Sequence, residues 1–227
     1  MNTNTKIEWC DATWNIVVGC KNACWYCYAK RMNDRFKWIP KWNEPQIFIK
    51  RLGEPSKIKK PSKIFVCSMS DLFGDWIPKE IIEEVIKVAK DNPRHTFQFL
   101  TKNPKRYSEF NFPENCWLGI TIDGTENKIV AQNKISYLER KNNYRFISFE
   151  PLLGDVSYLS YDVNLVIIGA QTGPKAIKPK QKWIDSIRHS NIFYKNNIIK
   201  IYPQYAQKRI QTNKKTQRKN KEMNCEN

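Results

Sequence analysis

Apolar runs of strand length recur along the chain and are separated by segments with helical periodicity. Seven runs are candidate strands: residues 16–18, 63–68, 95–100, 116–120, 144–149, 164–169 and 192–194. Helical patterns lie at residues 28–36, 44–50, 78–91, 128–141 and 183–189. From residue 63 onward the strand candidates begin roughly 20 to 32 residues apart, which is the spacing of βαβ units in a parallel sheet.

The apolar runs do not alternate strictly with polar residues, and this favours strands that are covered on both faces. Seven strands are one short of a closed eight-stranded (β/α) barrel. We therefore predict an α/β protein with an incomplete (β/α) barrel of six to seven parallel strands. For a chain of 227 residues, we expect this domain over residues 1–195, followed by a basic, partly disordered C-terminal extension over residues 196–227.

Polar residues follow six of the predicted strands at the point where each strand ends. They are Asp71, Lys102, Asp123, Glu150, Gln171 and Lys195. The carboxyl ends of parallel strands meet at one face, and barrels of this kind build their active sites there. Each residue alone can be explained as a strand-end cap, but together they predict an active site at this face.

Three cysteines lie within eight residues, with the spacing C-x3-C-x2-C at Cys20, Cys24 and Cys27. Thiolates favour zinc, copper(I) or iron–sulfur clusters. The chain has seven cysteines in total, and an odd number with three clustered indicates metal binding rather than a disulfide framework. A structural zinc site is normally closed by four protein ligands, whereas an iron–sulfur cluster can keep one iron free for another ligand.

The net charge of +17 is concentrated towards the C-terminus. Residues 175–227 hold 14 Lys and Arg against three acidic residues. This balance predicts DNA or RNA binding through phosphate contacts, although residues 208–221 alone fit a solubilising tail equally well. The chain has no apolar run long enough for a membrane span and no secretory signal at residues 1–6, so we expect a cytoplasmic protein without membrane contact.

The cysteine spacing, with Tyr26 directly before the last cysteine, resembles the signature of radical S-adenosylmethionine (SAM) enzymes. The resemblance implies that Cys20, Cys24 and Cys27 bind a [4Fe-4S] cluster whose fourth iron is chelated by SAM. It implies a reductant protein such as flavodoxin or ferredoxin as electron donor. By analogy, Tyr26, Ser68, Ser70, Asp71 and Gln171 would bind the cofactors. Lys102, Asp123, Glu150 and Lys195 would contact the SAM carboxylate, the ribose or the substrate.

Further segments resemble a phage- and prophage-associated three-cysteine-motif family that is regarded as radical SAM-like. They are residues 7–9, 11–15, 68–73, 99–102, 118–121, 149–154 and 173–174, in the same order over residues 6–195. The chain departs from this family at Cys10, usually threonine, and at Ile16, usually proline. At Gln171 an amide replaces an expected carboxylate, and an amide cannot act as a base.

Two functional hypotheses follow. The first is a radical SAM enzyme that acts on a nucleic acid or nucleotide-type substrate. The second is a non-enzymatic nucleic-acid-binding protein with a structural zinc site, whose fourth ligand would be Cys10, His95, His189 or a distant cysteine.

Overall fold

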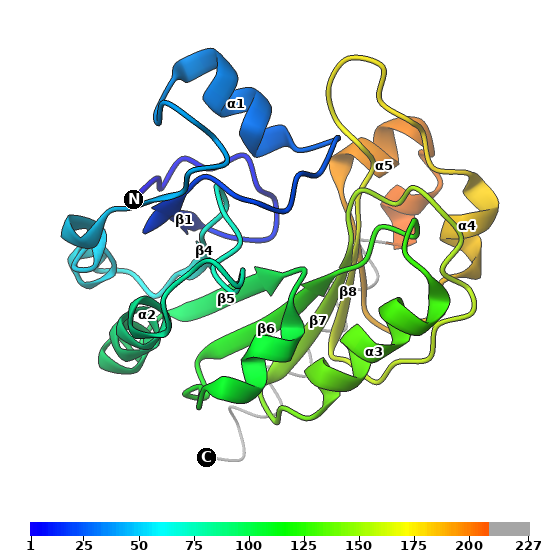
Figure 1. Cartoon of the computed structure of the whole chain (residues 1–227). Coiled ribbons are helices and arrows are strands. Elements are labelled where there is room, and N and C mark those ends of the chain that lie inside the picture. Colours follow the sequence, from blue (N-terminus) through cyan, green and yellow to red (C-terminus); the bar gives the residue numbers. More distant parts are fainter. Residues whose placement is uncertain (209–227) are drawn as a thin grey trace.

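A single parallel sheet of seven strands forms the centre of the computed structural model, which describes residues 1–208 (Figure 1). In spatial order the strands are β1 (Ala12–Trp14), β4 (Lys63–Val66), β5 (Thr96–Thr101), β6 (Cys116–Thr121), β7 (Tyr144–Phe149), β8 (Leu165–Ile168) and β9 (Ile192–Tyr194). Every neighbouring pair is parallel. Because β1 and β9 are the two edges of the sheet, the barrel is incomplete, and the predicted fold class is confirmed.

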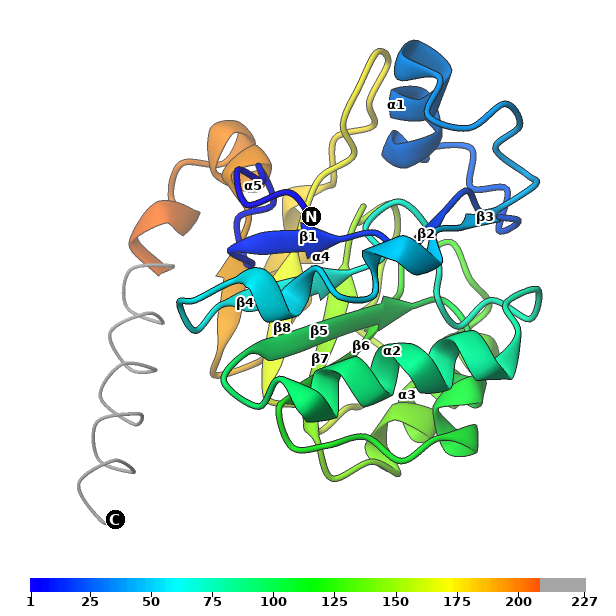
Figure 2. The ribbon, with the colours of Figure 1, turned by 90° about the vertical axis from the view of Figure 1, so that its left-hand side faces the viewer.

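Helices connect the strands, and α2 (Lys79–Asp91) and α3 (Lys128–Glu139) cover the outer face of the sheet (Figures 1 and 2). The other helices are α1 (Tyr28–Phe36), α4 (Gln181–Ser186) and α5 (Asn196–Ile201), and there are 3-10 turns η1 (Ile49–Arg51), η2 (Pro55–Lys57) and η3 (Pro104–Glu109). In α2 the buried residues Ile82, Val85, Ile86 and Ala89 form one stripe, as their spacing predicts. The helices predicted at residues 28–36, 78–91 and 128–141 are confirmed, since they correspond to α1, α2 and α3.

The predicted first strand is wrong. Ala12–Trp14, not residues 16–18, pairs with β4, and the Asp11 carboxylate accepts a hydrogen bond from the Lys63 backbone N–H at 2.7 Å beside this pairing. The apolar run that follows forms β2 (Val17–Val18), which pairs antiparallel with β3 (Gln46–Ile47) in a separate small sheet. Two short buried segments stand next to each other here, and hydrophobicity alone cannot tell which one joins the main sheet.

The helix predicted at residues 44–50 is also wrong. Gln46 and Ile47 pair with β2, and the Phe48 N–H donates to the Ile16 carbonyl at 2.7 Å. The short 3-10 turn η1 (Ile49–Arg51) begins directly after Phe48. Partners distant in sequence satisfy these backbone groups, so the local helical pattern is overridden.

The two faces of the sheet pack differently. The large core, which includes Ile64, Phe97 and Leu118, lies under the helices. The concave face carries a smaller cluster of Trp9, Phe65, Phe146 and Ile167, and the Trp9 ring lies 4.6 Å from that of Phe65, centroid to centroid. The N-terminal segment thus packs across the inside of the partial barrel and leaves the carboxyl ends of the strands open above it.

The packed structure continues beyond residue 195. Tyr205 is buried, and its ring stacks on that of Tyr194 in β9 with centroids 4.8 Å apart. Residues 209–227, which hold most of the predicted basic extension, lie outside the described residues. Within residues 1–208, no helix combines the length and the apolar character that crossing a membrane requires.

Gly119 should be intolerant of any side chain. It lies on the concave face of β6, and a Cβ atom there would overlap the ring of Phe146. We expect Gly119→Ala to lower the free energy of unfolding by about 1–3 kcal/mol, because the ring must move in a packed layer. Gly53→Ala is the matched control, since a Cβ atom at Gly53 meets nothing within 4 Å. Urea unfolding of both variants tests this, and equal stabilities would contradict it.

Candidate active site at the carboxyl ends of the strands

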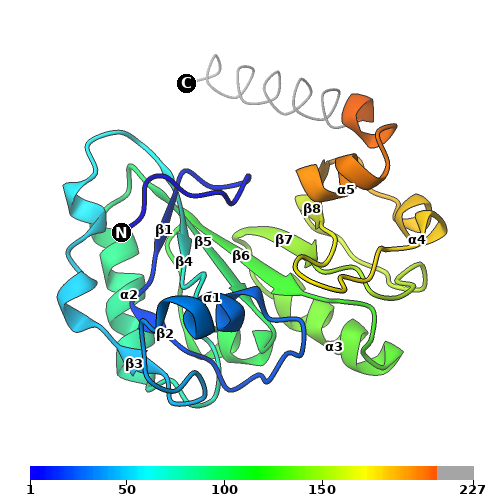
Figure 3. The same ribbon diagram turned by 90° about the horizontal axis from the view of Figure 1, so that it is seen from above.

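A cavity of about 970 Å³ opens at the carboxyl ends of the strands. Its lining includes Cys20, Cys24 and Cys27, together with the predicted site residues Tyr26, Ser68, Ser70, Asp71, Lys102, Glu150, Gln171 and Lys195. Asp123 does not line the cavity but contacts Tyr26 and Lys102, which do. Seen from above, α1 lies over the strands at this end (Figure 3). The structure thus brings together all the residues that the sequence predicts for the site.

Backbone contacts hold the cysteine loop against the sheet. Gly19 has a φ of +102°, and a Cβ atom there would lie 2.8 Å from the Trp42 carbonyl oxygen, so only glycine fits. The Gly19 N–H donates to the Met69 carbonyl at 3.0 Å. At the far end of the loop, the Cys27 sulfur caps α1 by accepting the Lys30 N–H at 3.3 Å.

The three thiols suit a soft metal group. Burial raises the pKa of Cys20 to about 12 and also raises the pKa of Cys24. A thiolate therefore needs a positive partner here, and a metal provides one because it deprotonates the thiols that coordinate it. Within residues 1–208, no three or more His, Cys, Asp or Glu side chains converge closely enough to share one ion. The chemistry of the donor set, three cysteine thiols that line one cavity, suits zinc, copper(I) or an iron–sulfur cluster.

The histidines do not complete a zinc site at the cysteines. His95 directly precedes β5, at the amino end of the strands, and its Nδ1 accepts the Ser62 N–H at 3.2 Å. His189 precedes β9, and its two ring nitrogens lie 2.8 and 2.9 Å from the carbonyl oxygens of Asn191 and Val163. Both side chains lie at the edge opposite the cavity. Of the fourth ligands considered from the sequence, only cysteines remain.

Asp71 ties the cysteine loop to two strand ends. Its Oδ2 accepts hydrogen bonds from the Asn22 side chain at 3.0 Å and the Lys102 N–H at 2.9 Å. Its Oδ1 accepts from the Thr101 hydroxyl at 2.6 Å and the Phe73 N–H at 3.1 Å. Four donors occupy the carboxylate, whose side chain is buried. Asp71 therefore positions the site.

Tyr26, Asp123 and Lys102 form a second network beside the cysteines. The Tyr26 hydroxyl donates to Asp123, and the Lys102 Nζ lies 3.2 Å from the same carboxylate oxygen. Burial alone would raise the pKa of Asp123, but the charge of Lys102 and hydrogen bonds from Thr125 and Tyr26 outweigh it and lower the pKa to about 2. Asp123 is thus ionised and fixes a tyrosine and an ammonium group at the cavity wall.

Because of Asp123, the free energy of unfolding of the chain should fall in acid. Its pKa of about 2 in the folded chain lies below the ordinary value of 3.8, so its ionised form stabilises the fold above about pH 4. This contribution is lost as the pH falls from about 4 to 2. Asp123→Asn cannot titrate, and its free energy of unfolding should fall less steeply than that of the wild type between pH 5 and 2. Urea unfolding at stepped pH measures both slopes, and equal slopes would contradict the prediction.

Glu150 and Lys195 form an ion pair across the end of β8. Gly169 makes room for it, because a Cβ atom there would lie 2.9 Å from the Glu150 carboxyl carbon and 3.0 Å from the Lys195 side chain. Gln171 is held differently: its Oε1 accepts the Ile177 N–H at 3.1 Å. The amide thus supports the loop after β8, a role that a carboxylate oxygen would fill as well.

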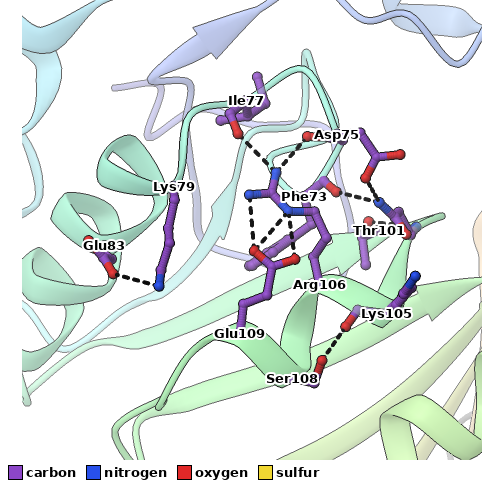
Figure 4. A network of polar contacts seen from close by, with 12 residues as sticks. Phe73, Asp75, Ile77, Lys79, Glu83, Thr101, Lys105, Arg106, Ser108 and Glu109 are labelled. Atoms are coloured by element: carbon purple, nitrogen blue, oxygen red, sulfur yellow. Dashed lines mark hydrogen bonds and ion pairs between the residues drawn. The ribbon is translucent and has the colours of Figure 1, made fainter.

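Two arginines were not predicted from the sequence. Arg31 of α1 donates to the Tyr26 carbonyl at 2.9 Å and to the Thr172 carbonyl at 2.6 Å. It joins the cysteine loop to the loop after β8, which rises beside α1 (Figure 2). Arg106 donates to the carbonyls of Gly74 and Ile77 and pairs with Glu109, which fixes the turn after Asp71 (Figure 4).

Solved structures of spore photoproduct lyase share this fold. One, complexed with dinucleoside spore photoproduct, is 8% identical, with a TM-score of 0.57 over 74% of this chain and 58% of that chain. A mutant of the enzyme is 11% identical, with a TM-score of 0.55 over 74% of this chain and 59% of that chain. A double mutant with bound AdoMet and dinucleoside spore photoproduct is 11% identical, with a TM-score of 0.51 over 61% of this chain and 45% of that chain. The chain spans about half the length of these proteins, and its seven-stranded partial barrel is the fold of these radical SAM neighbours.

The sequence itself places the chain in a family. Residues 4–226 match the family model described as "Protein of unknown function (DUF5131)", and the chain belongs to this family. No curated protein matches the chain significantly. The family match covers the whole partial barrel and extends beyond it on the C-terminal side.

Proposed function

We propose that the chain is a radical SAM enzyme that binds a [4Fe-4S] cluster through Cys20, Cys24 and Cys27 and acts on a nucleic acid or nucleotide-type substrate. The observation that carries this proposal is that three thiols face one cavity at the active-site end of a radical SAM-type barrel. When bound, the cluster and SAM would supply a one-electron reductive cleavage of the sulfonium carbon–sulfur bond. Electrons would come from a reductant protein such as flavodoxin or ferredoxin.

The residues around the cysteines would have two kinds of role. Ser70 and Asp71 hold the loop in place, since the Ser70 hydroxyl donates to the Gly19 carbonyl at 2.6 Å and Asp71 fixes Asn22. Lys102 and Lys195 present ammonium groups to the cavity, each partnered by one carboxylate. An ammonium group donates three hydrogen bonds, so both lysines can also bind a carboxylate or phosphate of a ligand.

The cavity walls would protect the reaction from water. Trp9, Phe65 and Leu100 form its apolar floor, next to Thr121 and Ser148 of neighbouring strands. Arg31 holds α1 over this floor through the loop after β8. A reactive radical requires such exclusion of water and side reactions, which is the contribution that a protein makes to cofactor chemistry.

The nucleic-acid substrate is supported by two observations. The relatives in fold were solved with a dinucleoside photoproduct, and the chain carries a net charge of +17. Phosphates paired with Lys and Arg release counterions, so such a charge drives binding to DNA or RNA. The basic C-terminal residues would add to this affinity.

A SAM-cleavage assay tests the proposed function. After anaerobic reconstitution with iron and sulfide, dithionite reduction should yield 5′-deoxyadenosine from SAM. The Cys24→Ala variant treated in the same way is the control. Reconstituted, iron-loaded wild type that forms no more 5′-deoxyadenosine than this variant would refute the proposed function.

A further inference from the structure

Exposed aromatic side chains gather at the mouth of the cavity. Tyr28, Met32, Phe36 and Trp38 are all exposed large apolar residues of α1 and the turn after it; we call these four residues the aromatic rim. Tyr28, Met32 and Trp38 also line the cavity. The rim is therefore continuous with the site itself.

The local backbone creates a stacking surface within the rim. Lys37 ends α1 in the left-handed conformation, with a φ of +52°. The turn brings the rings of Phe36 and Trp38 into a stacked arrangement, 5.3 Å apart and 21° from parallel, while each side chain stays 49% exposed. A flat ring pair that is half open to solvent can receive a further planar group on its free face.

The rim lies in a strongly basic segment. Residues 21–41 contain six Lys and Arg against one acidic residue, Asp34, which is paired with Lys30 at 2.7 Å. The Arg35 guanidinium lies 5.1 Å from the Phe36 ring centroid and also lines the cavity. Aromatic rings interleaved with cations are the combination that binds unpaired nucleic-acid strands, because bases stack and phosphates pair.

We propose that the aromatic rim binds a single strand of nucleic acid and stacks an unpaired base on the Phe36–Trp38 pair at the mouth of the cavity. This inference rests on the proposed function, since it names the form in which the substrate approaches the site. Bases in a duplex are stacked on each other and cannot use this surface. The rings of the rim would contact bases and the neighbouring cations would contact phosphates, so this surface would not distinguish DNA from RNA, which differ at the 2′-hydroxyl.

Binding of a fluorescein-labelled 15-nucleotide thymidine oligomer to the full chain, measured by anisotropy, tests the proposal. We expect Phe36→Ala/Trp38→Ala to weaken binding by about five- to 100-fold, in line with the loss of base–aromatic stacking. The salt dependence should stay unchanged, because no charge is removed. Arg35→Ala should instead reduce the salt slope by about 0.7, as expected for one lost phosphate contact on a single strand. A uridine oligomer should behave like the thymidine oligomer.

Ile129→Ala is the matched control, because Ile129 is an exposed apolar residue of another helix, α3. This control variant should bind the oligomer as tightly as the wild type does. The double variant should bind a duplex of the same length as tightly as the wild type does. The proposal is overturned if the double variant keeps wild-type affinity, if the control loses as much, or if the duplex is equally affected. It is also overturned if the double variant binds the oligomer like the wild type and loses affinity only for anionic lipid vesicles. Binding of the oligomer does not require SAM cleavage, so the two proposals can fail separately. If the wild type binds the oligomer through the rim but does not cleave SAM, only the proposed function is refuted.

Discussion

Cys24→Ala should lose SAM cleavage by more than about 100-fold, together with the iron–sulfur absorption, and still fold. Changes to the partners of metal ligands already reduce activity by about 10- to 100-fold, so loss of a ligand should exceed this. Stability should change by less than about 1 kcal/mol, because the Cys24 thiol is half-buried and its hydrogen bond to the Asn22 carbonyl is 3.9 Å long. Visible absorption, 5′-deoxyadenosine formation and far-UV circular dichroism measure the three quantities.

Cys10→Ala is the control for this experiment. Cys10 is half-buried like Cys24, and it lies outside the three-cysteine motif. We expect this variant to retain iron and SAM cleavage. If Cys24→Ala and Cys10→Ala both unfold the chain and both release one zinc ion, the cysteines form a structural zinc site instead, since such sites supply folding energy directly.

Asp71→Ala should destabilise the fold by about 3–5 kcal/mol. The substitution leaves four donors without their acceptor, two of them backbone N–H groups of Phe73 and Lys102, and a buried donor without a partner costs about 1–3 kcal/mol. Some donors can turn towards the cavity and water, which keeps the sum below four full penalties. Thermal unfolding should show a decrease in melting temperature of about 6–20 °C.

Asp75→Ala is the matched control for Asp71→Ala. Asp75 lies in the same turn, is exposed, and accepts a hydrogen bond from the Asn103 side chain at 2.7 Å. We expect an effect within about 0.5 kcal/mol, as is usual for surface substitutions. Equal losses in the two variants would show that the turn, rather than the buried carboxylate, is responsible.

The strands from β4 to β9 could be predicted because each is buried and the helices between them have regular apolar stripes. The first strand could not, because Ala12–Trp14 and Val17–Val18 are both short and buried, and their partners are chosen by tertiary pairing. The helix predicted at residues 44–50 was wrong for the same reason. Its backbone partners lie about thirty residues away in sequence.

The candidate site was predictable where its residues follow strand ends or have metal-ligand spacing. Arg31 was not, because its contact with Thr172 spans 141 positions and nothing local marks it. Asp71 illustrates a different limit: its place in the site was predicted and its contact with SAM stays a prediction, but the four protein donors that its carboxylate accepts could not be read from the sequence. The aromatic rim lies in α1, whose bounds were predicted, yet its exposure depends on what α1 covers.

Metal analysis of anaerobically purified and reconstituted chain tests the central claim most directly. We expect about four iron and four sulfide per chain, bound by Cys20, Cys24 and Cys27 and absent from Cys24→Ala. One tightly held zinc per chain, with no iron taken up on reconstitution, would contradict the radical SAM function.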